Sequence, residues 1–176
     1  FYVAEHPTFK TNDIRFCYVG IGGGPIDMFC LGNKIVACTY GMGYTEAGAV
    51  GGLQNCNLTQ CLIFDCETSL MINNDCHVVA CLIGSPTFPV ERMIRINGNN
   101  NIFSANSIVP QSAGAGAATA VVEFRAGVLK ANKFIGNSFA NLADGAPIFL
   151  FQEAGSDITD CVFSGNTFTI TDGPVI

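Results

Sequence analysis

The residues Asn101-Ile102-Phe103-Ser104-Ala105-Asn106-Ser107-Ile108 contain the repeat pattern from which the fold is predicted. An Asn opens each half of the stretch, an apolar residue follows two places later, and the two Asn residues are five positions apart. When Cys is allowed in place of Asn, the same eight-residue pattern occurs seven times along the chain. The seven units begin at Asn12, Asn33, Cys56, Cys76, Asn101, Asn132 and Cys161. This recurrence indicates one stacked repeat structure between residues 12 and 168.

The spacing of the units indicates which kind of repeat structure to expect. Successive units begin between 20 residues (56 to 76) and 31 residues (101 to 132) apart, a spread too wide for a rigid solenoid such as a leucine-rich repeat. A parallel β-helix tolerates this spread, because its short strands stack at about 4.8 Å while the loops between them differ in length. We therefore predict an all-β, right-handed parallel β-helix of about seven coils. A sandwich or barrel of short strands is the alternative fold.

The repeated positions divide into an apolar set and an Asn/Cys set. The apolar residues at the third and eighth places are predicted to fill the interior, where Phe103, Phe134 and Phe163 would stack on one another. The first and sixth places hold only Asn and Cys. Asn accepts the left-handed backbone conformation and hydrogen-bonds to its own stacked copies, so we predict two inward-facing ladders at the turns.

The cysteines fit the same pattern. Seven of the nine fall on the two ladder positions, and Cys30 and Cys66 lie outside them. Interchange of Cys with Asn argues against obligate disulfides and favours small buried thiols. The odd number of cysteines also suits folding in a reducing compartment. We therefore predict reduced cysteines.

A zinc site is the alternative use of four cysteines on adjacent units, Cys56, Cys61, Cys76 and Cys81. Ordinary zinc sites use Cys-x2-Cys pairs, whereas these pairs are Cys-x4-Cys. The ladder pattern already explains all four residues without a metal. We therefore predict no metal site and no cofactor.

Composition limits the partners that the chain is expected to have. Charged residues make up 12% of the 176 residues, whereas ordinary soluble domains have about 25%, which favours a surface buried in part against other subunits. The 8 basic residues are scattered and the net charge is −6, so nucleic acid is not an expected partner. No apolar run reaches the roughly 18 residues of a membrane span, so no membrane insertion is expected.

The domain prediction is one β-helix over residues 1–176. An uncapped β-helix would expose strand edges at both ends, and exposed edges favour aggregation. We therefore expect the sequence to be a piece of a longer chain, in which flanking domains or partner subunits cover these edges.

Glutamates are the candidates for chemistry. Five of them precede the next ladder residue by 8 to 10 positions, which predicts one acidic stripe along the coils. Carboxylates on neighbouring coils would be about 5 Å apart and those on alternate coils about 9.5 Å, close to the spacings in retaining and inverting glycosidases. The five residues are Glu46, Glu67, Glu91, Glu123 and Glu153.

The predicted site follows from this stripe. We predict the catalytic candidates to be Glu91, Glu123 and Glu153. The predicted substrate-binding residues are Glu67, Arg95 and Arg125. The alternative is an acidic edge, facing solvent or a second subunit, that arginines partly neutralise.

The Asn-x-apolar-x-x-Asn-x-apolar repeat resembles the right-handed β-helix superfamily of pectate lyases, sugar epimerases and bacteriophage tailspikes. A Cys-rich, weakly charged segment without an evident end cap is most similar to a tailspike shaft. The resemblance implies a homotrimer in the virion tail, made in the host cytoplasm, that binds and in some members cleaves host cell-surface polysaccharide. No catalytic motif of these families maps onto a numbered residue here.

Two other functions stay open. One is a pectate-lyase-like or glycosidase domain, although the absence of Trp and the presence of only four Tyr leave few aromatic platforms for sugar. The other is a structural stalk or adhesin without chemistry. The repeat pattern is specific for the fold and does not decide among these functions.

Overall fold

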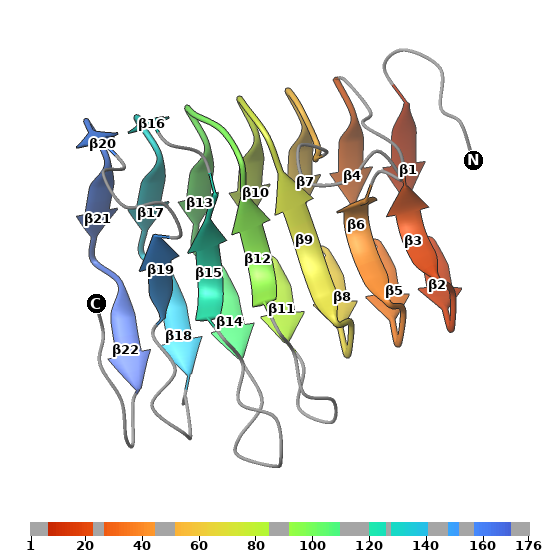
Figure 1. Cartoon of the computed structure of the whole chain (residues 1–176). Helices are drawn as coiled ribbons and strands as arrows, with labels where there is room; N and C mark the ends of the chain where they lie inside the picture. Colours follow the sequence, from red (N-terminus) through yellow and green to blue (C-terminus); the bar gives the residue numbers. More distant parts are fainter. Residues whose placement is uncertain are drawn as a thin grey trace.

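The fold is an all-β parallel β-helix, as predicted. The computed structural model describes residues 7–22, 27–44, 52–84, 92–109, 120–125, 128–140, 148–151 and 157–169. Every regular element in these ranges is a β-strand, and the strands of successive coils pair in parallel (Figure 1). The chain winds through the walls of the coil in turn, and each wall is a sheet that runs along the axis.

The first wall is a seven-stranded sheet with spatial order β1-β4-β7-β10-β13-β17-β21. Its strands are β1 (Thr8–Lys10), β4 (Phe29–Leu31), β7 (Asn57–Thr59), β10 (His77–Val79), β13 (Ile102–Ser104), β17 (Lys133–Ile135) and β21 (Val162–Ser164). The middle residues of these strands lie in register along the axis. They are Phe9, Cys30, Leu58, Val78, Phe103, Phe134 and Phe163.

The second wall also contains seven strands, in the order β2-β5-β8-β11-β14-β18-β22. Its strands are β2 (Asp13–Arg15), β5 (Lys34–Val36), β8 (Leu62–Phe64), β11 (Leu82–Gly84), β14 (Ser107–Val109), β18 (Ser138–Ala140) and β22 (Thr167–Thr169). Their middle residues form the second core column, which is Ile14, Ile35, Ile63, Ile83, Ile108, Phe139 and Phe168.

The third wall contains six strands, in the order β19-β15-β12-β9-β6-β3. They are β3 (Val19–Gly22), β6 (Tyr40–Tyr44), β9 (Thr68–Ile72), β12 (Arg92–Ile96), β15 (Ala120–Phe124) and β19 (Phe149–Phe151). A separate pair, β16 (Val128–Lys130) and β20 (Asp157–Thr159), precedes the first wall in the last two coils. In the described residues, this third wall falls one strand short of the number of coils predicted.

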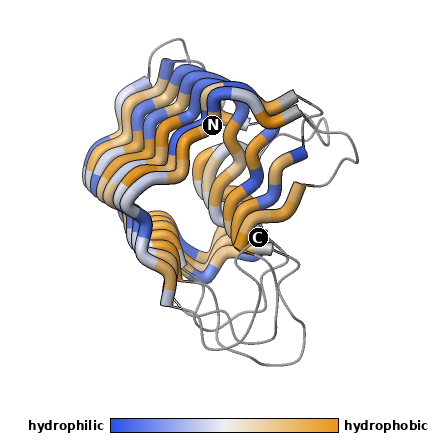
Figure 2. Tube along the Cα trace, turned by 90° about the vertical axis from the view of Figure 1, so that its left-hand side faces the viewer, coloured by the Kyte–Doolittle hydropathy of each residue, from blue (hydrophilic) through white to orange (hydrophobic). Residues whose placement is uncertain are grey.

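The core consists of side chains stacked in columns. Phe134 is fully buried and lies parallel to Phe103 at a centroid distance of 4.6 Å and to Phe163 at 5.4 Å. Phe139 and Phe168 stack at 5.1 Å in the second wall. The predicted Phe stacks are therefore confirmed. Figure 2 looks along the axis and shows that residues of like hydropathy recur at the same place from coil to coil.

The corners between walls need a left-handed backbone residue. Between β13 and β14 this residue is Ala105, with φ 54°, and it directly precedes the ladder residue Asn106. The same conformation directly precedes the other ladder residues, at Thr11, Phe16, Gly32, Ala37, Asn55, Gln60, Asp65, Asp75, Ala80, Asn100, Ala131, Gly136, Asp160 and Gly165. The prediction that the ladder Asn itself takes this conformation is wrong, because its side chain has a different role.

The ladder side chains join one coil to the next. The Asn106 side-chain amide donates to Asn137 Oδ1 at 2.9 Å and to the carbonyl oxygen of Val78 at 2.9 Å, on the coils at either side. The backbone N–H of Asn106 donates to the same Asn137 Oδ1 at 3.0 Å. One amide side chain therefore connects three coils and satisfies a buried backbone donor.

Cys takes the place of Asn because its thiol reaches the equivalent carbonyl. The Cys81 thiol contacts the Leu58 carbonyl oxygen at 3.7 Å, one coil before the Val78 carbonyl that Asn106 uses. Its sulfur also accepts from the backbone N–H of Cys61 at 3.4 Å. Thiol and amide thus occupy the same position, although sulfur makes the longer and weaker contacts.

The described residues form three ladders, whereas two were predicted. In the first two repeat units, the predicted assignment of residues to ladders is displaced by one corner of the coil. The strand register places Asn12 and Asn33 in the column of Cys61, Cys81, Asn106, Asn137 and Asn166. A second column contains Cys56, Cys76, Asn101, Asn132 and Cys161. The third contains Cys17, Cys38 and Cys66.

The shift has a simple physical cause. Each corner needs the same residue types at the same five-residue spacing, so a frame that begins at Asn12 cannot distinguish one corner from the next. Cys66, predicted to lie off the ladders, belongs to the third column, and Cys30 is a fully buried residue of the first wall. All nine cysteines are thiols.

Replacement of Asn137 tests the ladder. Asn137→Ala removes the acceptor of the Asn106 N–H and the donor to the Phe103 carbonyl. Buried groups left unpaired cost about 1–3 kcal/mol each, so we expect a loss of about 2–4 kcal/mol in the free energy of unfolding, measured by urea denaturation. The matched control, Asn137→Cys, installs the residue that this column uses at Cys81 and should lose about half as much. Equal losses would contradict the explanation of the interchange.

The left-handed backbone at Ala105 leads to a prediction of the opposite sign, an increase in the free energy of unfolding. A left-handed Ala is strained by about 1–2 kcal/mol, and the glycine at Gly136 shows that the corner accepts Gly. Ala105→Gly should therefore raise the free energy of unfolding by about 0.5–1 kcal/mol after the entropic cost of glycine. In the strand residue Ala140, the same change should lower it by a similar amount. Destabilisation by both changes would argue against strain at the corner.

Candidate functional site

The predicted site residues Glu123, Arg95 and Arg125 come together on the third wall. Glu123 on β15 pairs in register with Arg95 on β12. Arg95 Nε lies 2.9 Å from Glu123 Oε2, and Arg125 Nε lies 3.6 Å from the same oxygen. The Glu123 side chain is fully buried, whereas those of Arg95 and Arg125 are 13% and 26% exposed. Glu123 is therefore enclosed between two guanidinium groups.

This arrangement favours a structural role for Glu123. A general acid or base has to reach a proton of the substrate, either directly or through one water molecule. The Glu123 carboxylate instead holds two arginines, which balance its charge where water is excluded. Glu123 as a catalytic residue stays a prediction, and it would require the ion pairs to open.

The predicted acidic stripe is wrong for the two glutamates that the structure describes. Glu67 is exposed and directly precedes β9. The β9 residue that pairs with Arg95, and through it with Glu123, is Met71. The two glutamates thus belong to different columns, because the count of residues to the next unit includes loops of unequal length. Glu46, Glu91 and Glu153 lie outside the described residues.

A cluster of tyrosines, which the sequence analysis did not single out, lies near the N-terminal end of the third wall. The Tyr40 and Tyr44 rings stack with centroids 3.8 Å apart and an interplanar angle of 18°. The Tyr18 ring stands edge-on to both, at 5.5 and 5.8 Å, and is 62% exposed. We call these three residues the tyrosine surface. The one sequence signal for it is that three of the four tyrosines fall between positions 18 and 44.

A β-bulge in β6 brings the stacked pair together. The register slips there, since Ile21 pairs with Met42 and Gly22 pairs with Tyr44. The extra residue, Gly43, has φ 87°, and a Cβ at this position would clash with the Met71 carbonyl oxygen. Glycine thus permits the bulge, which turns Tyr44 toward Tyr40.

Charged residues lie beside the tyrosine surface. Burial is the main cause that raises the pKa of the Tyr40 phenol, and Tyr18 and Glu67 raise it further, while Arg95 lowers it. The phenol is therefore protonated at neutral pH and can donate as well as accept hydrogen bonds. Two of the predicted binding residues, Glu67 and Arg95, are thus close enough to Tyr40 to act on it electrostatically.

The cysteines of the proposed zinc alternative divide between two ladders. Cys56 and Cys76 stack in one column, and Cys61 and Cys81 stack in another, at the opposite end of the first-wall strands. Among the described residues, no group of three or more His, Cys, Asp or Glu side chains is arranged to hold a metal ion. Nor does any helix in those ranges have the length and apolar character required to cross a membrane.

A matched pair of variants tests the buried ion pairs. Glu123→Gln leaves two partly buried arginines without their counter-charge, and removal of one partner from a buried pair costs about 3–5 kcal/mol. The double variant Arg95→Met/Glu123→Leu should recover most of this loss, because the same column contains Met71 and Leu150. Thermal and urea unfolding would measure both. A double variant as unstable as the single one would mean that the column requires charge.

Comparison of the chain with protein-family models, curated proteins and solved structures found no match. The parallel β-helix fold is seen directly in the strand pairing, whereas no comparison supports the tailspike part of the prediction.

Proposed function

We propose that the chain binds polysaccharide through the tyrosine surface and does not cleave it. The observation that carries the proposal is the Tyr18 ring, which is 62% exposed although it contacts two other rings. Sugar rings present apolar C–H faces, which pack on aromatic faces, and hydroxyl groups, which need hydrogen-bond partners at the edge of such a contact. Aromatic walls with a few polar groups are the usual composition of ligand sites.

The neighbouring charges fit sugar hydroxyl groups. Glu67 is exposed and supplies acceptors, and the Arg95 guanidinium supplies donors. The phenol groups of the tyrosines can do both. The exposed Tyr18 ring, which stands edge-on to the stacked pair and is bordered by these groups, would recognise a neutral or weakly charged sugar chain that lies across the first coils.

Cleavage receives less support than binding. Glycosidases in general use two carboxylates on either side of the scissile bond. Of the three glutamates predicted to be catalytic, Glu123 is enclosed by arginines, and the other two lie outside the described residues. A glycosidase or lyase is therefore the second hypothesis, and a stalk without a ligand is the third.

The biological setting in this proposal is attachment of a virion to its host. A homotrimeric, tailspike-like fibre in the virion tail would present the tyrosine surface to host cell-surface polysaccharide. The support is the resemblance of the repeat and the low charged fraction of 12%, which suits a surface partly buried between subunits. The net charge of −6 weighs against nucleic acid as the partner.

Binding to purified capsular and O-antigen polysaccharides tests the proposal. We expect at least one polysaccharide to bind, and Tyr18→Ala and Tyr40→Ala each to weaken its affinity about two- to tenfold, since a lost aromatic contact is worth about 0.5–1.5 kcal/mol. The control is Phe16→Ala, which removes a ring that is 83% exposed but belongs to the preceding corner. Isothermal titration calorimetry would measure the affinities.

Two results would contradict the proposal. If Phe16→Ala weakened binding as much as the tyrosine variants, the effect would not come from the tyrosine surface. Release of new reducing ends from the bound polysaccharide, lost in Glu91→Gln or Glu153→Gln, would establish the glycosidase hypothesis instead.

A further inference from the structure

The third ladder column places two thiols directly above one another at one corner. Arg15 pairs with Val36 before this corner, and Val19 pairs with Tyr40 after it. Counting from either side brings Cys17 opposite Cys38. The intervening backbone continues the pairing, since the Thr39 N–H donates to the Cys17 carbonyl oxygen at 3.1 Å.

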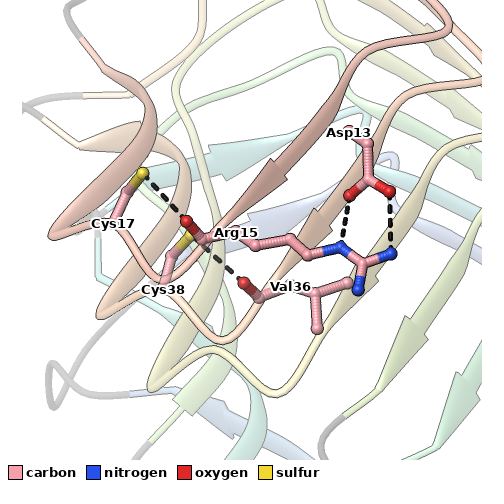
Figure 3. Close-up of polar contacts among 5 residues, drawn as sticks. All are labelled: Asp13, Arg15, Cys17, Val36 and Cys38. Carbon is pink, nitrogen blue, oxygen red and sulfur yellow. Dashed lines mark hydrogen bonds and ion pairs between the residues drawn. The ribbon is translucent and has the colours of Figure 1, made fainter.

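This geometry suits a disulfide between coils. Neighbouring strands lie about 4.8 Å apart, and disulfides join Cα atoms about 4.4–6.8 Å apart. Both thiols also turn the same way, because Cys17 Sγ contacts the Arg15 carbonyl oxygen at 3.3 Å and Cys38 Sγ contacts that of Val36 at 3.6 Å (Figure 3). Both neighbours in the column, Cys17 and Cys66, influence the pKa of the Cys38 thiol.

Accessibility distinguishes this pair from the other stacked thiols. Cys17 is exposed, whereas Cys38 is buried. In the other stacked pairs, Cys38/Cys66, Cys56/Cys76 and Cys61/Cys81, every side chain is at most 3% exposed. A reagent in solution can therefore reach one member of the first pair and neither member of the other three.

We propose that Cys17 and Cys38 are a redox-active pair that closes to a disulfide by exchange with a small external disulfide such as oxidised glutathione. The Cys17 thiolate attacks one glutathione sulfur, forms a mixed disulfide and releases the first glutathione thiolate. The Cys38 thiolate then attacks the Cys17 sulfur and releases the second. In the balance, the two protein thiols lose two protons and two electrons, and oxidised glutathione is reduced to two glutathione molecules.

The order of the two steps follows from burial. Burial raises the pKa of the Cys38 thiol, so its thiolate is scarce at neutral pH and the exchange begins at Cys17. Burial raises the pKa of Cys66, the next member of the column, to about 12, which keeps this thiol protonated. The second step should therefore become faster as the pH rises.

The bond would secure the outermost coil of the described structure. In those residues, β1, β2 and β3 are the terminal strands of their sheets and pair on one side only. End units of repeat proteins open more readily than internal units. A covalent link from coil one to coil two would oppose this opening next to the residues that carry Tyr18 and Tyr40.

Oxidation of the whole chain followed by peptide mapping tests the proposal. The chain is incubated with oxidised glutathione, remaining thiols are blocked with iodoacetamide, and chymotrypsin then separates the peptides of Cys17 and Cys38, cutting after Phe16, Tyr18, Leu31 and Tyr40. Mass spectrometry should find the two peptides joined. In Cys38→Asn, which installs the other residue type used at the ladders, Cys17 should stop at the mixed disulfide with glutathione.

Hydrogen exchange supplies a second measurement. Closing a loop of this length should slow exchange of the amides in β1, β2 and β3 on the order of 100-fold, and dithiothreitol should reverse the effect. The control Cys81→Asn leaves the corner intact and should still form the bond. Cys17 that stays as the mixed disulfide in the unaltered chain, or oxidation of Cys56/Cys76 before Cys17, would overturn the proposal.

Discussion

Satisfaction of one backbone N–H at each corner is the constraint on which this β-helix depends. Within a strand, an amide pairs with a carbonyl of the neighbouring coil, but at the ladder residue the N–H points to a side chain instead, as when Asn106 donates to Asn137 Oδ1. The acceptor must therefore be short, point inward and recur on every coil. Asn meets this need best, and Cys meets it with longer contacts while also filling apolar space, which explains why the ladder corners are dominated by these two residue types.

The same constraint explains what could be predicted from the sequence. The five-residue spacing of Asn and Cys is a local property of each corner, so the fold and the Phe stacks followed from the sequence. The assignment of the first two units to particular corners could not be predicted, because Asn12 and Cys17 satisfy the pattern equally well at adjacent corners. The left-handed residue was also misplaced, since the sequence shows the repeated spacing of Asn and Cys but not that Ala or Asp one position earlier bends the chain.

The candidate site was less predictable, since it depends on loop lengths. The positions of Glu67 and Glu123 relative to the next unit suggested a shared stripe, yet the strand register separates them. Arg95 and Glu123 meet because their strands pair, and no spacing in the sequence signals this contact. The Tyr40–Tyr44 stack depends on a bulge at Gly43, which a sequence of small residues does not reveal.

The proposed binding site uses positions at which the stacking of coils imposes no residue type. The first residues of the third-wall strands β3, β6 and β9 are Val19, Tyr40 and Thr68, which pair in register. A column that accepts an aliphatic, an aromatic and a hydroxyl side chain has no common structural requirement. Tyr40 therefore cannot be explained by the stacking of coils in the way that Asn106 can. An aromatic side chain that the stacking of coils does not require can instead contact a ligand, which is consistent with the role proposed for the tyrosine surface.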